Sequence, residues 1–256
     1  MMMKRERIRG MATSGDLIKA VAEVLGIPEA TATTYYRSLR EGGLVTKGGR
    51  GPSAARMTSR DAAHLLIAVG GARFEKDSAE KIVRDFARVE AFDSARRMAV
   101  ASEDNERWNN ADWIEGDGTW IFEGFVIPEM QSLPYRHHFV DALVAVIEAA
   151  MAGTLKNATR SILPLADCSH GIEICFYGPE PHASISIDFH TTGSESGDFR
   201  YSETVEYQLS DQIDKNINNY VSVNEKMRTE YCAGDLEIKR SFTWRTIYKV
   251  ADTIIL

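Results

Sequence analysis

The side chains with the widest chemical repertoire gather between residues 167 and 190 of this 256-residue chain. The thiols and imidazoles there are potential metal ligands: Cys168, His170, Cys175, His182 and His190. Their spacing matches no paired-cysteine zinc pattern, and several fall on expected strands as ordinary side chains. We therefore expect no metal site, and nothing in the sequence implies a cofactor.

A thiol and a base also stand side by side in the run Asp167-Cys168-Ser169-His170. Neighbours in sequence rarely form a catalytic pair, and nothing nearby suggests an oxyanion site. The chain contains no phosphate loop, dinucleotide glycine pattern, zinc-protease helix or nucleophile elbow. We therefore expect no enzymatic activity and assign no catalytic residue.

Another set of polar side chains follows helical spacing between residues 28 and 41. At about 100° per residue, Ala32, Tyr36 and Leu39 share one side, which we expect to face a core. The other sides carry small hydroxyl residues and one arginine: Thr31, Thr33, Thr34, Arg37 and Ser38. Such a surface allows close approach to a DNA major groove and offers donors to phosphates and base edges. Taken alone, it better suits the solvent-facing side of an ordinary amphipathic helix.

The sequence before this helix predicts a second one. Thr13 and Asp16 match a capping box, so a helix should begin there. Apolar residues then follow helical spacing as far as Leu25. Gly26 is typical of a helix end, and Pro28 suits the first turn of the next helix.

The sequence after it continues with Gly42-Gly43, a strand-like pair at residues 44–45, and a flexible basic loop with Lys47 and Arg50. The order helix, turn, helix, short strand, basic loop, short strand resembles the winged helix-turn-helix of bacterial transcriptional regulators. The resemblance covers about a quarter of the chain. It implies that residues 29–41 are a recognition helix and that Lys47 and Arg50 lie on a wing beside the phosphate backbone. One departure is that such domains usually have another helix before this pair.

Charge is divided unevenly along the chain. The net charge is −7, yet residues 1–60 hold eleven Lys or Arg and five Asp or Glu, which leaves −13 for the remainder. A basic head on an acidic body suits DNA binding through the head alone, because phosphate contacts dominate affinity. Residues 1–12 resemble a basic arm of the kind that enters a minor groove, with Arg5, Arg7 and Arg9. Met1 and Met11 are both candidate starts.

The rest of the chain mixes helical and strand patterns. Thr58 and Asp61 form another capping box, before a helix at residues 61–69 that is apolar on almost every side. Further helices are expected at about 77–98, 139–152, 209–232 and 242–256, the last capped by Ser241, and strands at 120–127, 172–177, 183–190 and 199–207.

These patterns predict an α+β protein: a winged helix-turn-helix followed by an α+β domain with a small antiparallel sheet. We expect a DNA-binding domain at 1–71, with its arm at 1–12. A connecting helix and acidic loop follow at 72–118, and a dimerisation or effector domain at 119–256. The helix at 139–152 has an apolar surface wide enough for a domain core or for the interface of a homodimer.

The sequence therefore predicts a cytoplasmic, dimeric, sequence-specific regulator of transcription that binds double-stranded DNA, such as a prophage or mobile-element repressor. No apolar run is long enough to span a membrane. The alternative is a dual-function mobile-element protein. In that case the C-terminal domain inhibits a host protein while the N-terminal domain regulates its own operon.

Overall fold

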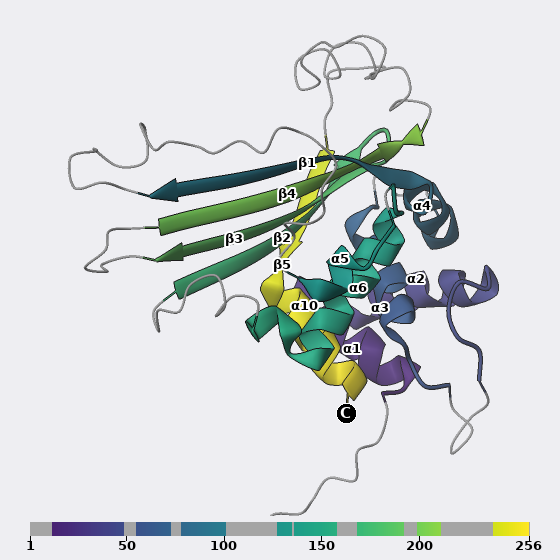
Figure 1. The fold of residues 1–256 in the computed structure, drawn as a ribbon. Helices are drawn as coiled ribbons and strands as arrows, with labels where there is room; N and C mark the ends of the chain where they lie inside the picture. The colour runs from purple at the N-terminus through teal and green to yellow at the C-terminus, as the bar shows by residue number, and fades with distance from the viewer. Residues whose placement is uncertain are drawn as a thin grey trace, which may run out of the picture.

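The protein is described by a computed structural model at residues 12–48, 55–72, 78–100, 127–134, 136–157, 168–191, 199–210 and 238–255. These residues form a five-stranded antiparallel sheet with helices gathered on one side of it (Figure 1). Strands β1 to β4 extend past the helices to the left of this view. The expected α+β class is confirmed.

The first two helices lie where the sequence predicts them. α1 (Ser14–Leu25) begins with a capping box in which the Thr13 amide donates to the Asp16 carboxylate at 2.9 Å. It ends at Gly26, whose φ of 65° is left-handed and suits a residue without a side chain. α2 (Glu29–Glu41) follows after a short turn.

α3 (Ser59–Gly70) begins with the second expected capping box and is buried along most of its length. The short strands expected on both sides of the basic loop are absent from the described residues 44–48 and 55–57, so that expectation is wrong there. The reason is that backbone groups of these segments are hydrogen-bonded to other parts of the chain. The Thr46 amide donates to the Asp61 carboxylate at 2.7 Å, and the Met57 amide donates to the Ala12 carbonyl at 3.0 Å.

The prediction of a single helix at about 77–98 is wrong. α4 (Ala79–Phe86) is short, and β1 (Val89–Val100) follows it directly. β1 pairs with β4 (Phe199–Leu209) along its whole length, with a bulge near residue 92. Pairing with a distant strand has outweighed a weak helical pattern, since strand formation depends on neighbours more than on intrinsic preference.

α5 (Pro128–Gln131) leads to α6 (Phe139–Ala152), whose bounds match the expectation. The apolar sides of α6 are buried by other parts of the chain, chiefly α3 and α10 (Trp244–Ile255). Of the two uses expected for this helix, a domain core and a dimer interface, the structure shows the domain core. The same surface is not available to a second copy of the protein.

The sheet has the strand order β1-β4-β3-β2-β5. β2 (Cys168–Gly178) and β3 (His182–Thr191) form the central hairpin and contain the expected strands. β5 (Ile238–Thr243) was not expected. Ser241 lies within it, opposite Cys175, so the prediction that Ser241 caps the last helix is wrong.

An aromatic cluster holds the helices against the sheet. Phe139 of α6 lies 5.6 Å from Phe176 of β2 and 5.2 Å from Tyr207 of β4, measured between ring centroids. Phe86 of α4 contacts Phe176 edge-on at 5.4 Å. Edge-to-face contacts of this kind contribute beyond the burial of the rings themselves.

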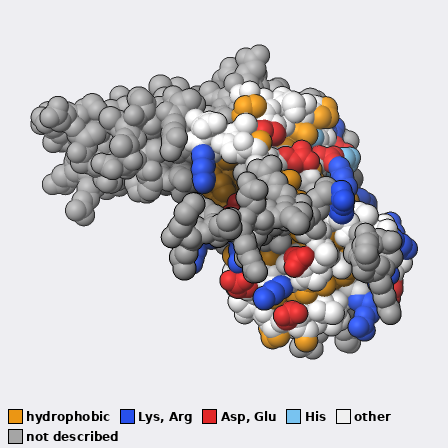
Figure 2. Space-filling model, turned by 90° about the horizontal axis from the view of Figure 1, so that it is seen from below, with side chains coloured by type: hydrophobic (Ala, Val, Ile, Leu, Met, Phe, Trp, Pro, Cys, Tyr) orange, Lys and Arg blue, Asp and Glu red, His pale blue; other side chains and the backbone are white. Residues whose placement is uncertain are grey.

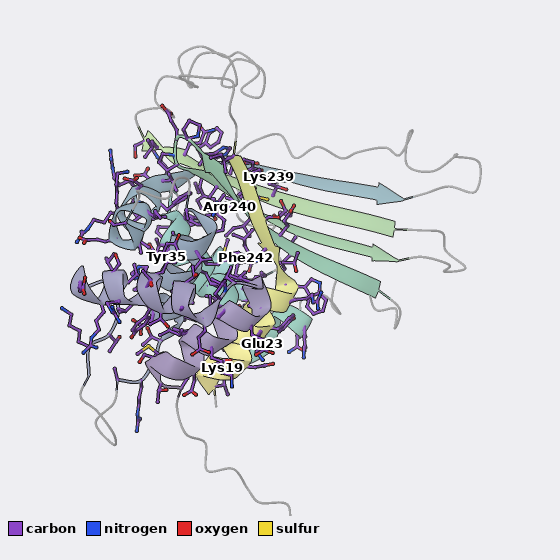
Figure 3. All side chains as sticks on the ribbon, turned by 180° about the vertical axis from the view of Figure 1, so that it is seen from behind. Lys19, Glu23, Tyr35, Lys239, Arg240 and Phe242 are labelled. Atoms are coloured by element: carbon purple, nitrogen blue, oxygen red, sulfur yellow. The ribbon has the colours of Figure 1, made fainter. Side chains whose placement is uncertain are left out.

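The buried side chains form one hydrophobic cluster from Leu17 to Ile254, which continues across the domain boundary expected near residue 71. α1 packs against α10, and Glu23 forms an ion pair with Lys249 at 3.0 Å. Figure 3 shows Lys19 and Glu23 on the part of α1 that borders α10.

Several expectations fall outside the described residues. They are the arm at 1–11, the acidic loop at 101–118, the strand at 120–126 and most of the helix at 209–232. Among the described helices, none has both the length and the apolar character needed to cross a membrane.

Candidate nucleic-acid interface

α2 is fixed to the body through three side chains. Ala32, Tyr36 and Leu39 are buried, as their spacing predicts. The Tyr36 hydroxyl donates to the Met57 sulfur at 3.5 Å, which ties α2 to the segment after the basic loop. Thr33, Tyr35 and Ser38 are half-buried, and the remaining side chains of α2 are exposed.

The outer face of α2 consists mainly of small side chains. Ala30, Thr31, Thr34 and Arg37 are all exposed, while Thr33 is half-buried. Ala30, Thr34 and Arg37 are spaced by four and three residues, so they form one stripe along the helix. The structure thus brings together most of the residues proposed for base recognition.

The threonine hydroxyls do not present their protons to a partner. Thr33 Oγ1 donates to the Glu29 carbonyl at 2.8 Å, and Thr34 Oγ1 donates to the Ala30 carbonyl at 2.9 Å. In this structure the hydroxyl protons of Thr33 and Thr34 are therefore engaged within the helix, while the expectation that these side chains contact DNA stays a prediction. They keep oxygen lone pairs as acceptors, and their methyl groups are free to make contacts.

Ser38 is turned away from this face. It is half-buried, and its hydroxyl accepts a hydrogen bond from the Glu80 amide at 3.4 Å, at the start of α4. Arg84 of α4 also donates to the Gly42 carbonyl at 3.4 Å. α4 therefore covers the C-terminal end of α2, and Ser38 contributes to that contact rather than to the outer face.

The basic loop leaves and rejoins the body at one point. A side-chain carbon built on Gly48 would lie 2.3 Å from the Ala55 backbone nitrogen, so the two chain segments are in contact there. Lys47, just before the loop, is exposed. Arg50 lies outside the described residues.

Asp61 anchors the base of this loop. Its buried carboxylate accepts hydrogen bonds from the Thr46 amide and hydroxyl, at 2.7 and 2.9 Å, before the loop. It also accepts from the Thr58 amide and hydroxyl, both at 2.9 Å, after the loop. The sequence indicated Asp61 only as a helix cap. Its contact with Thr46 depends on the fold and has no local signal.

The N-terminal arm begins beside the same loop. The Met57 amide donates to the Ala12 carbonyl at 3.0 Å, so Ala12 lies beside the segment that follows the loop. Arg5, Arg7 and Arg9 precede this point and lie outside the described residues. The three segments proposed for DNA contact are therefore attached to one region of the body.

Charge on the described surface is mixed. α2 exposes Glu29 and Glu41 as well as Arg37 and Arg40, so its exposed side is formally neutral. Figure 2 likewise shows basic and acidic side chains interspersed over the visible described surface. The exposed side of α2 by itself therefore supplies no net positive charge for phosphate attraction.

The face of the sheet away from the helices carries another polar group. His182 Nε2 lies 2.8 Å from the Glu206 carboxylate, and the His182 ring stacks on Tyr177 at 4.7 Å. Lys239 lies over the Tyr177 ring, with its Nζ 5.8 Å from the ring centroid. Burial raises the pKa of the Cys175 thiol nearby, so this thiol stays protonated and is a poor nucleophile.

Two of the five candidate metal ligands have side chains in the described part of the structure. The side chains of Cys168, His170 and His190 lie outside the described part of the structure, whereas Cys175 is buried and His182 pairs with Glu206. Within the described residues, no three His, Cys, Asp or Glu side chains are placed to hold a metal ion.

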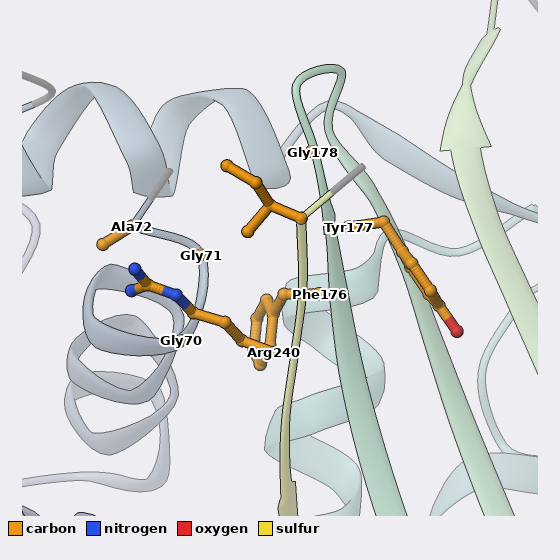
Figure 4. A pocket seen from close by; sticks show the side chains of 8 residues that line it. Gly70, Gly71, Ala72, Phe176, Tyr177, Gly178 and Arg240 are labelled. Carbon is orange, nitrogen blue, oxygen red and sulfur yellow. The ribbon is translucent and has the colours of Figure 1, made fainter. Parts of the chain in front are cut away.

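A shallow hollow lies between the end of α3 and strands β2 and β5. Phe176, Gly178 and Arg240 line it together with residues 70–72, and it contains about 140 Å³ of space that includes open solvent. Figure 4 shows the Arg240 side chain extending from β5 toward Ala72. The hollow is smaller than the ~300 Å³ at which ligand pockets begin.

Comparisons with protein-family models, curated proteins and solved structures found no match to this chain. The resemblance to a winged helix-turn-helix therefore stays a hypothesis.

Proposed function

We propose that this protein binds double-stranded DNA through α2, with the basic loop and the N-terminal arm beside it, and regulates transcription in the cytoplasm. One observation carries the proposal: the small exposed side chains of Ala30, Thr31 and Thr34 stand beside Arg37 on the outer face of α2. A helix with such a face can enter a major groove without steric hindrance.

The distribution of charge suggests a division of labour. The exposed side of α2 is neutral, so its contribution is to specificity rather than to bulk attraction. Lys47 is exposed just before the basic loop, and Arg50 and the arm arginines add positive charge to the two segments that we propose to flank α2. Phosphate contacts position a protein on DNA, while base contacts determine the sequence that it prefers.

We also propose that the protein acts as a homodimer. A single helix in the groove buries limited surface, and proteins of this kind commonly add contact area by binding two half-sites as a dimer. α6 is excluded as the interface because its apolar surface is covered within one subunit. Light scattering should then give twice the chain mass of 28.5 kDa. A mass of one chain at micromolar concentration would rule out a stable dimer.

Selection of bound duplexes from a random-sequence pool tests the proposed function. The full-length protein should enrich a defined sequence, and its affinity for that sequence should fall with salt. A chain that starts at Met11 lacks the arm arginines. It also lacks Lys4, and it should select the same sequence with a salt slope smaller by up to about four units. Failure of the full-length protein to retain any duplex would refute the proposal.

A further inference from the structure

We infer that α2 recognises T·A base pairs by their methyl and amino groups, and that its central contact is made by the methyl group of Thr34. This inference rests on the proposed function, because it states which bases α2 would read once it lies in a major groove. It assigns to Thr34 a role in specificity that does not depend on donating a hydrogen bond.

The first step concerns what α2 exposes near its N-terminus, the part of a recognition helix that usually meets base edges. Ala30, Thr31 and Thr34 are exposed there, and Thr33 is half-buried beside them. Each of these side chains ends in at least one methyl group. Asn and Gln, the usual readers of adenine, are absent from residues 29–41.

The second step concerns the hydroxyl groups. Thr34 Oγ1 donates its only proton to the Ala30 carbonyl at 2.9 Å, and Thr33 Oγ1 donates to the Glu29 carbonyl at 2.8 Å. With the protons held inside the helix, the outward chemistry of these side chains is a methyl group and an oxygen that can only accept.

The third step matches this chemistry to the base pairs. In the major groove thymine presents its 5-methyl group, and adenine presents an amino donor beside an acceptor nitrogen. The methyl group of Thr34 can contact the thymine methyl group, and its oxygen can accept a hydrogen bond from the adenine amino group. Guanine presents only acceptors, which a threonine without an available proton cannot bind. Cytosine presents an amino donor but no methyl group, so the methyl contact is what distinguishes T·A from G·C. Arg37, one turn further along the stripe, is the residue that suits guanine.

The fourth step sets the size of the effect. Burial of one CH₂ or CH₃ group is worth about 0.8 kcal/mol, which corresponds to about a fourfold change in affinity. Replacing one contacted thymine by uracil removes one methyl group and leaves every hydrogen bond of the base pair in place. A fourfold loss of affinity is therefore expected for each contacted thymine.

The experiment uses the full-length protein and the duplex that it selects from a random pool. Each thymine in that duplex is replaced in turn by uracil, and affinity is measured by fluorescence anisotropy. Thr34→Ser removes the protein methyl group and keeps the hydroxyl, whereas Thr34→Val keeps the methyl and removes the hydroxyl. Thr253→Ser is the matched control, because Thr253 makes the same hydrogen bond, to the Lys249 carbonyl at 2.8 Å, in α10.

The wild-type protein, Thr34→Val and Thr253→Ser should each bind the uracil duplex about fourfold more weakly at one or more positions. Thr34→Ser should bind the thymine and uracil duplexes equally at the position that Thr34 contacts. Equal binding of both duplexes by the wild-type protein would overturn the inference and leave DNA binding intact. Binding without any selected sequence would also overturn it, and no binding at all would refute the proposed function itself.

Discussion

The double role of Asp61 leads to a prediction about stability. Its carboxylate caps α3 through Thr58 and also binds the amide and hydroxyl of Thr46, at 2.7 and 2.9 Å, before the basic loop. Asp61→Ala removes both functions. Asp16 provides a matched control, because its carboxylate forms the same kind of capping box with Thr13 and, among the described residues, makes no hydrogen bond or ion pair with any other element.

The expected losses differ between the two positions. Losing a capping residue costs about 1 kcal/mol, which should describe Asp16→Ala. A hydrogen bond to a charged group contributes about 1.5–3 kcal/mol. We use the lower end for the Thr46 contacts, because Thr46 is exposed and water can replace the carboxylate. Asp61→Ala should therefore lower the free energy of unfolding by about 2.5 kcal/mol, about 1.5 kcal/mol more than Asp16→Ala.

Urea unfolding of the full chain, followed by circular dichroism, measures both losses. Thr46→Val removes only the hydroxyl and should give a smaller loss than Asp61→Ala. If Asp61→Ala and Asp16→Ala lower the free energy of unfolding equally, the contact with Thr46 has no energetic value. The description of Asp61 as the anchor of the loop would then be wrong.

Three further predictions concern the core. Burial lowers the pKa of His64 and of His137, so as the pH falls the unfolded chain takes up protons before the folded protein does. The free energy of unfolding should therefore decrease from about pH 7 to pH 5, and urea titrations should show a smaller decrease for His137→Gln. Val146 is fully buried, so Val146→Asp should abolish the cooperative unfolding transition, and a folded monomer would instead place this residue at an interface. A side-chain carbon on Gly70 would lie 2.6 Å from the Phe176 ring, whereas one on Gly171 meets nothing within 4 Å. Gly70→Ala should therefore cost about 1–3 kcal/mol and Gly171→Ala much less; equal thermal shifts would contradict this.

The sequence predicted elements whose signals are local. The capping boxes at Thr13 and Thr58 gave the starts of α1 and α3, and the apolar spacing of residues 139–152 gave the bounds of α6. In β3, alternating apolar residues gave both the strand and its buried face.

Elements that depend on distant partners were missed. β1 pairs with β4 across about 100 to 120 residues of sequence, and nothing within residues 89–100 indicates that partner. β5 buries only Phe242 among its six residues, so it has no alternating pattern to recognise.

The same distinction applies to the candidate site. Helical spacing identified the outer face of α2, with Thr34 and Arg37 exposed and Leu39 buried. It did not show that Ser38 faces α4, because that contact involves the Glu80 amide in another helix. Nor did it show that the Thr34 proton is held by the Ala30 carbonyl.

The most direct test of DNA recognition compares Arg37→Ala with Arg50→Ala on the selected duplex and on an unrelated one, at several salt concentrations. Arg37 lies on the exposed face of α2, so its loss should weaken binding to the selected duplex and reduce the preference for it. Arg50 lies in the basic loop, so its loss should weaken binding to both duplexes alike and reduce the salt slope by about one unit. Binding isotherms that are unchanged for both variants at every salt concentration would contradict the assignment of α2 and the loop as the DNA-binding surface.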